Sequence, residues 1–121
     1  MARILVAEDD QFTREIVQRA LEAAGHQVLA AEDGSEALAA TEGGASFDLV
    51  VTDVEMPGIS GLELAEQILK RNPSQKILVM SGLADELNRA KALKSPNVRL
   101  ITKPVTIDTI KAETGKLLAG N

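Results

Sequence analysis

The sequence predicts one doubly wound α/β domain, in which helices cover both faces of a five-stranded parallel sheet. Three observations support this fold class. The chain has 121 residues, about the length of a single domain. Five short apolar runs recur at intervals of roughly 24 residues, enough for one strand and one crossover helix each. Helical patterns lie between the runs, and strands that alternate with helices form α/β sheets with helices on both faces.

Each apolar run is continuous, which is typical of strands buried on both faces of a parallel sheet. The expected strands are Ile4–Ala7, Val28–Ala31, Leu49–Val51, Ile77–Met80 and Val98–Ile101.

Five helices are expected between and after these strands. In the first, four apolar residues at four-residue steps predict the buried face, and Gly25 predicts its end; the four are Phe12, Ile16, Ala20 and Ala24. Shorter helices are expected at residues 34–43 and 84–94. Between them, Ser60 and Glu63 form a capping-box pattern that opens a helix ending before Asn72. Its expected inward residues are Leu62, Ala65, Ile68 and Leu69, and those of the last helix are Ile107, Ile110, Thr114, Leu117 and Leu118.

The composition excludes several function classes. There is no cysteine, so disulfides and thiolate zinc sites are excluded. The single histidine, His26, excludes a multi-histidine metal site; we expect it to be exposed beside Gly25 rather than to act as a phosphorelay histidine. No apolar run approaches the roughly 20 residues of a membrane span, and the start lacks a signal-peptide pattern, so a cytoplasmic domain is expected. Nucleic acid is a poor partner because the net charge is −5 and there is no tryptophan or tyrosine.

Chemistry-bearing side chains follow the strands. In doubly wound sheets, ligands bind beyond the carboxyl ends of the strands. The residues at those positions are Glu8, Asp9, Asp10, Asp33, Asp53, Ser81 and Lys103. Carboxylates gathered at one edge repel one another unless they share a cation, and Mg²⁺ suits a set of oxygen ligands. A metal ion, a lysine and a hydroxyl around one carboxylate are the groups that stabilise a transferring phosphoryl group. Asp10 and Asp33 are better explained as helix caps.

Four motifs together resemble the CheY-like receiver domains of two-component response regulators. They are Ile4-Leu-Val-Ala-Glu-Asp-Asp10, Leu49-Val-Val-Thr-Asp-Val-Glu-Met-Pro-Gly58, Val79-Met-Ser-Gly82 and Thr102-Lys-Pro104. The motifs have the family's order and spacing along essentially the whole chain. The resemblance implies one receiver domain over residues 1–121, with a flavodoxin-like strand order 2-1-3-4-5.

The resemblance also implies a role for each site residue. Asp53 matches the phosphoacceptor, Ser81 the switching hydroxyl and Lys103 the cation that pairs with the phosphoryl group. Asp9 matches the direct Mg²⁺ ligand, Glu8 a second acid that acts through water, and the Glu55 carbonyl a third protein ligand. Pro104 matches the family's cis-proline.

Two positions depart from the family pattern. Leu100 stands where many members have tyrosine or phenylalanine, so an aromatic rotamer switch is not expected and conformational coupling should run through Ser81. Pro96 stands in a segment where small residues are common, and it predicts a short fourth helix.

Three function classes are compatible with these residues. The first is a phosphorylation-operated switch, not a true enzyme, which receives its phosphoryl group from a histidine kinase or histidine phosphotransferase and slowly loses it by autodephosphorylation. The second is an aspartyl phosphatase, but such enzymes need a second aspartate two residues after the nucleophile, where this chain has Glu55. The third is a receiver-like domain that needs no phosphate; Asp53 and Lys103 argue against it. The chain is expected to be either a stand-alone regulator or a piece of a longer regulator or hybrid kinase.

Charge is distributed unevenly. Residues 1–66 contain fourteen acids and only three bases, Arg3, Arg14 and Arg19, whereas residues 67–121 contain ten bases and four acids. We therefore expect a basic face on the last two helices and the strand between them, which would bind an acidic surface of a downstream protein. Its predicted members are Arg89, Lys91, Lys94, Arg99, Lys111 and Lys116.

Overall fold

Five parallel strands form one sheet in the order β2-β1-β3-β4-β5, as the sequence predicts. The computed structural model describes residues 1–44, 46–82 and 95–119. The strands are β1 (Arg3–Ala7), β2 (Gln27–Ala31), β3 (Leu49–Asp53), β4 (Ile77–Ser81) and β5 (Val98–Thr102). The helices are α1 (Gln11–Ala23), α2 (Gly34–Glu42), α3 (Gly61–Arg71) and α5 (Ile107–Leu118). The helix expected at 84–94 lies outside the described residues.

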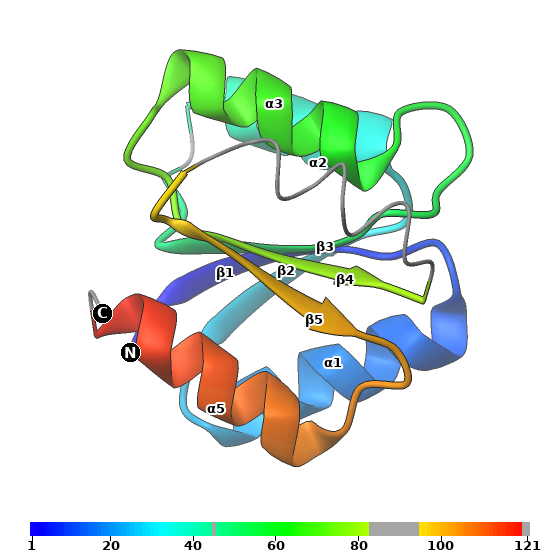
Figure 1. Ribbon diagram of the computed structural model, residues 1–121, viewed down its shortest axis with the longest axis vertical. Coiled ribbons are helices and arrows are strands. Elements are labelled where there is room, and N and C mark those ends of the chain that lie inside the picture. The colour runs from blue at the N-terminus through cyan, green and yellow to red at the C-terminus, as the bar shows by residue number, and fades with distance from the viewer. Residues whose placement is uncertain (45, 83–94, 120–121) are drawn as a thin grey trace.

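The sheet separates two layers of helices (Figure 1). Helices α2 and α3 cover one face, and α1 and α5 cover the other. Each face has its own apolar core: Leu64 and Ile68 belong to the α2–α3 side, and Leu21 and Ile110 to the α1–α5 side. The start of the chain and the end of α5 lie at the same side of the molecule (Figure 1).

Burial on both faces is confirmed for the central strands and is wrong for the edge strands. All five residues of β3 and of β4 are buried. In β2 burial alternates, and Leu29 is 49% exposed; β5 is mostly half-buried. An edge strand has only one neighbouring strand, so its outer side remains open to solvent.

The buried face of α1 differs from the predicted one. Val17, Ala20 and Leu21 are buried, whereas Phe12 is 72% exposed and Ala24 is also exposed. Steps of four residues drift by about 40° per step around a helix of 3.6 residues per turn. Phe12 and Ala24 therefore cannot share one face.

The prediction of an inward Ile107 is likewise wrong. Ile107 is the first residue of α5 and is 50% exposed, while Ile110, Thr114 and Leu117 are buried. In α3, Leu62, Ala65 and Ile68 are buried as predicted, and the helix ends at Arg71.

The predicted helix caps are confirmed. Asp10 accepts a hydrogen bond from the Thr13 amide at 2.8 Å, and Asp33 accepts one from Glu36 at 2.8 Å. Ser60 caps α3 through the Glu63 amide at 3.2 Å. These caps satisfy amide groups that have no partner within the first helical turn. They begin α1, α2 and α3 in the segments that follow β1, β2 and β3.

His26 is half-buried rather than exposed. Its Nδ1 accepts a hydrogen bond from the Ala2 amide at 3.1 Å, so it joins the loop after α1 to the start of β1. A membrane-spanning helix is not found: no helix among the described residues has the length and apolar character to cross a bilayer.

Candidate functional site

The predicted site residues lie at the carboxyl ends of neighbouring parallel strands. Glu8 and Asp9 directly follow β1, Asp53 ends β3, Ser81 ends β4, and Lys103 follows β5. The register pairs Ala7 with Thr52 and Ser81 with Thr102, so these strands end at nearly the same level. The loop beyond β5 lies at the arrowhead end of the sheet (Figure 1).

Lys103 joins two buried carboxylates. Its Nζ lies 3.1 Å from Asp53 Oδ1 and 3.3 Å from Glu8 Oε1. Glu8 is fully buried and Asp53 is 2% exposed. Although Lys103 and Glu8 are 95 residues apart in the chain, the fold brings them into contact.

Three carboxylates form a cluster that could hold a cation. One oxygen each from Glu8, Asp9 and Asp53 lies within 4.8 Å of the others, with Asp9 exposed and the other two buried. A single lysine cannot neutralise three carboxylates. Asp53 Oδ1 also accepts no hydrogen bond from the described residues, and its contact with Lys103 is an ion pair without hydrogen-bond geometry. This donor set of hard oxygens fits Mg²⁺.

The electrostatics of the cluster raise the pKa of its two buried acids, Glu8 and Asp53. Burial, followed by the neighbouring charge of Asp53, raises the pKa of Glu8 from 4.5 to about 7. Burial also raises the pKa of Asp53, against the opposing effect of Lys103. For Lys103, burial lowers the pKa, but the pairing with Asp53 and Glu8 outweighs it, and the net change is upward. The buried acids are therefore under strain when ionised, and a bound cation would relieve it.

A close backbone contact holds Asp53 in place. The Gly61 amide donates to the Val54 carbonyl at 3.0 Å, and a Cβ on Gly61 would collide with the main-chain carbonyl of Asp53. The Thr52 hydroxyl donates to that same carbonyl at 2.9 Å. Glycine at the start of α3 thus lets this helix approach the end of β3.

The other predicted residues surround the cluster. Ser81 is buried, and its carbonyl accepts from the Lys103 amide at 3.0 Å. Glu55 is exposed, and its Oε1 accepts from the Gly82 amide at 3.4 Å. The peptide bond between Lys103 and Pro104 is cis. Leu100 is half-buried against the core on the α2–α3 side.

The predicted basic face is less basic where the structure describes it. Arg99 Nε lies 2.8 Å from Glu113 Oε2, and Lys116 Nζ lies 3.6 Å from Glu113 Oε1. One acid of α5 thus pairs with two of the predicted bases. Lys111 is exposed on the same helix. The other predicted members, Arg89, Lys91 and Lys94, lie outside the described residues.

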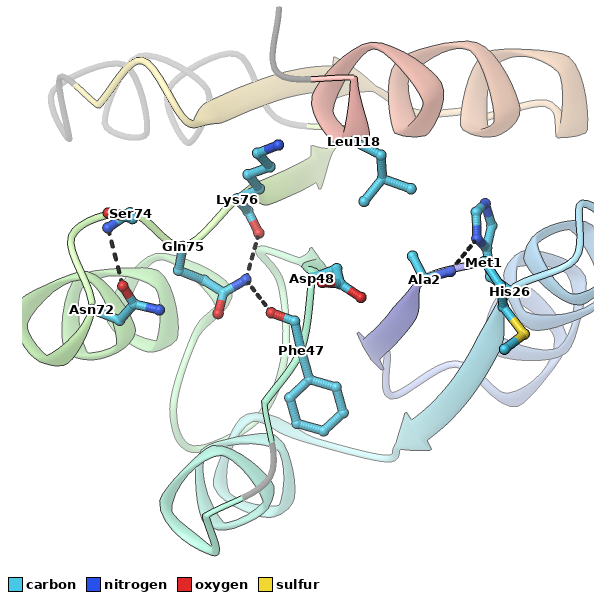
Figure 2. A pocket seen from close by; sticks show the side chains of 10 residues that line it. All are labelled: Met1, Ala2, His26, Phe47, Asp48, Asn72, Ser74, Gln75, Lys76 and Leu118. Carbon is cyan, nitrogen blue, oxygen red and sulfur yellow. Dashed lines mark hydrogen bonds between the residues drawn. The ribbon is translucent and has the colours of Figure 1, made fainter.

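A hollow of about 520 Å³ lies at the opposite edge of the sheet (Figure 2). It is lined by residues that precede β1, β3 and β4, such as Ala2, Asp48 and Lys76. The buried side-chain amide of Gln75 donates hydrogen bonds to the carbonyls of Phe47 and Lys76, so its role is structural. None of the strand-end residues described above lines this hollow, and size alone does not make it the candidate site.

Gly61 and Arg14 contribute to the site but were not predicted from the sequence. Arg14 Nη1 donates to the carbonyl oxygens of Glu8 and Asp9, at 2.9 and 3.4 Å. One signal was present in the sequence, because Arg14 is one of only three bases among the first 66 residues. No sequence signal indicated the close approach at Gly61.

Comparisons with known proteins agree with this geometry. Residues 4–114 match the family model of the response regulator receiver domain. The chain is 34% identical over 110 residues to the transcriptional regulatory protein YrkP of Bacillus subtilis, covering 91% of this chain and 46% of YrkP. It is 31% identical to the response regulator receiver protein CpdR of Brucella abortus, covering 98% of both chains. The structure of the response regulator protein TrrA of Thermotoga maritima, in complex with Mg²⁺ and BeF, superposes with a TM-score of 0.86, 33% identity and coverage of 97% of this chain and 99% of TrrA.

These relatives differ in length. The chain spans less than half the length of three curated relatives that it matches, at 46%, 28% and 43%.

Proposed function

Since the chain belongs to the response regulator receiver domain family, we propose that Asp53 is its phosphoacceptor and that phosphorylation of Asp53 operates a signalling switch. The contact that carries this proposal is the ion pair of 3.1 Å between Asp53 and Lys103, beside two further acids at one edge of the sheet. The expected donor is a phosphohistidine on a histidine kinase or histidine phosphotransferase.

In the proposed transfer, a carboxylate oxygen of Asp53 attacks the phosphorus of the phosphohistidine. A phosphorus–oxygen bond forms, the phosphorus–nitrogen bond breaks, and the electron pair and a proton remain with the departing imidazole. The product is an acyl phosphate on Asp53. Lys103 then faces a phosphoryl oxygen instead of the free carboxylate, and its positive charge stabilises the charge on the transferring group.

Mg²⁺ is the proposed cofactor. The residues that would hold it are Asp9, Asp53 and the Glu55 carbonyl, with Glu8 acting through water. A bound Mg²⁺ would neutralise negative charge on the phosphoryl oxygens. The chain's own residues do the rest: Asp53 supplies the nucleophile, Lys103 orients the group, and the Ser81 hydroxyl is proposed to bond the phosphoryl group and draw its loop toward it. Slow autodephosphorylation, by attack of water on the acyl phosphate, is part of the same proposal.

Phosphorylation is proposed to change binding rather than to release a metabolite. The proposed downstream partner is a protein with an acidic surface, which binds the basic residues of β5, α5 and the preceding segment. An aspartyl phosphatase remains the second candidate, because metal, lysine and hydroxyl are shared by both classes. Repeated turnover of small phosphoesters would identify a phosphatase.

The proposal is tested by the mass of the intact chain. Incubation with acetyl phosphate and Mg²⁺ should add one phosphoryl group to the wild type, and chelation of Mg²⁺ should prevent the addition. Asp53→Asn should add none, while Asp48→Asn, an exposed acid at the opposite edge, should be phosphorylated normally. Full phosphorylation of Asp53→Asn would contradict the assignment.

A further inference from the structure

The acidic loop after β1 is held by hydrogen bonds from both of its sides. The Glu8 amide donates to the Ala31 carbonyl at the end of β2, at 3.2 Å. The Glu8 carbonyl accepts from Arg14 Nη1 at 2.9 Å, and the Asp9 carbonyl lies 3.4 Å from the same nitrogen. Both main-chain groups of Glu8 are therefore paired, and the path of the backbone at this point is determined.

Arg14 is directed back toward the strand from the first turn of α1. Its amide donates to the Asp10 carbonyl at 2.9 Å, so its backbone is also tied to the end of the loop. Its side chain is only 14% exposed, although it carries a charge. Among the described residues, Arg14 forms an ion pair with Glu32, which is 73% exposed; its Oε1 lies 4.0 Å from Arg14 Nη2, so the pair is weak. The carbonyl contacts, and not that pair, account for the position of the guanidinium.

We propose that Arg14 is a positioning residue for the cation site: by holding the carbonyls of Glu8 and Asp9, it presets their carboxylates to bind a divalent cation. This inference rests on the proposed function, in which the cluster binds Mg²⁺. The physical reason is preorganisation. Without the anchor, carboxylates that repel each other would move apart, and a cation would have to reorder the loop on binding.

The direction of the change in Mg²⁺ affinity distinguishes a positioning role of Arg14 from a direct effect of its charge. A positive charge near a cation site repels the cation, so loss of the Arg14 charge alone should strengthen Mg²⁺ binding. Loss of the anchor should weaken it. Groups that orient metal ligands typically change metal affinity by roughly ten- to a hundredfold when removed, which is larger than the opposing effect of a charge partly screened by water.

The test compares Mg²⁺ affinities of the full chain at constant ionic strength. The amide resonances of Asp9 and Asp53 are followed by nuclear magnetic resonance during a titration with MgCl₂. Arg14→Met should bind Mg²⁺ roughly tenfold more weakly or worse. Arg14→Lys should stay closer to wild type, because both carbonyls face one nitrogen that an ammonium can replace. Arg19→Met, an exposed arginine on the same helix, should leave the affinity unchanged.

Equal or tighter Mg²⁺ binding by Arg14→Met, or a lysine variant as weak as the methionine variant, would overturn the positioning role. If the spectra show that Arg14→Met is unfolded, Arg14→Gln takes its place with the same expectation of weaker binding. A wild-type chain that shows no Mg²⁺-dependent shifts at Asp9 and Asp53 would instead overturn the proposed function, and the role of Arg14 with it.

Discussion

The buried carboxyl of Glu8 should make the stability of the Mg²⁺-free domain depend on pH. The perturbation is Glu8→Gln, which keeps the shape of the side chain and removes the charge. Glu8 is fully buried, and its pKa is raised to about 7 by burial and by the charge of Asp53. In the unfolded chain the pKa of this carboxyl returns to its ordinary value of 4.5.

The sign and size of the effect follow from these two pKa values. Below pH 4.5, Glu8 is protonated in both the folded and the unfolded state, so it does not change the free energy of unfolding. As pH rises toward about 7, the unfolded chain releases the proton while the folded chain retains it, so the free energy of unfolding falls. The interval of roughly 2.5 pH units, at about 1.4 kcal/mol per unit, corresponds to a loss of about 3 kcal/mol, most of it between pH 5 and pH 8.

Urea unfolding followed by far-ultraviolet circular dichroism measures this loss, since the chain has no tryptophan to report by fluorescence. In the presence of a chelator, the wild type should be less stable at pH 8 than at pH 5, and Glu8→Gln should lose most of this difference. Glu66→Gln, an exposed acid on α3, should behave as the wild type. Mg²⁺ should restore more stability at pH 8 than at pH 5, because it binds the ionised acids; at ten times its dissociation constant, a ligand adds about 1.4 kcal/mol. Equal wild-type stabilities at both pH values, or an unchanged slope in Glu8→Gln, would refute the reasoning.

Two further predictions follow from the packing around single residues, and a third follows from the distribution of charge along the sequence. Gly61→Ala should lower the free energy of unfolding by about 1–3 kcal/mol and impair phosphorylation, because the new Cβ would lie 2.8 Å from the Asp53 carbonyl carbon. Gly115→Ala is the control: its new Cβ has open space around it, so the variant should be more stable by about 0.5–1 kcal/mol in urea unfolding. Leu100→Ala should lower the free energy of unfolding by about 2 kcal/mol, the low end for a leucine, because Leu100 is half-buried. Phosphorylation by acetyl phosphate should be retained. A variant of full stability would contradict the packing role of Leu100. Charge reversal of Lys91 and Lys94 to glutamate should weaken capture of an acidic partner, most clearly at low salt, and leave the mass gain at Asp53 intact; unchanged binding across a salt series would remove the basic face as a docking surface.

The parallel sheet and the strand-end residues could be predicted because both follow from the backbone, whereas the strand order was implied by the resemblance to receiver domains. A chain that alternates buried strands with helices forms a parallel sheet, and the residue after each strand then lies at one edge. This geometry brings Asp53 and Lys103 together without any knowledge of their rotamers. The same argument applies to Asp10 and Asp33, whose positions before helices made capping the better interpretation.

Predictions failed where the outcome depends on how completely a neighbour covers a residue. Phe12 and Ile107 both lie in the first turn of a helix, and both apolar side chains remain exposed. Leu29 is exposed because β2 has no outer neighbour. Glu8 and Asp9 are adjacent acids, yet one is fully buried and the other exposed, a difference that depends on which way the chain turns after β1.

In the proposed function, the buried acids Glu8 and Asp53 would link the binding of protons, Mg²⁺ and the phosphoryl group, because all three act on the same cluster of charges. With a pKa of about 7, Glu8 retains a proton in part of the molecules at neutral pH, so a cation that needs its ionised form must release that proton. Lys103 offsets one negative charge of the cluster and leaves the rest. The proposed phosphoryl group on Asp53 would add negative charge next to the same lysine, and binding of a cation would then be more favourable. Mg²⁺ binding and phosphorylation should therefore reinforce each other, and both should weaken as pH falls below 7.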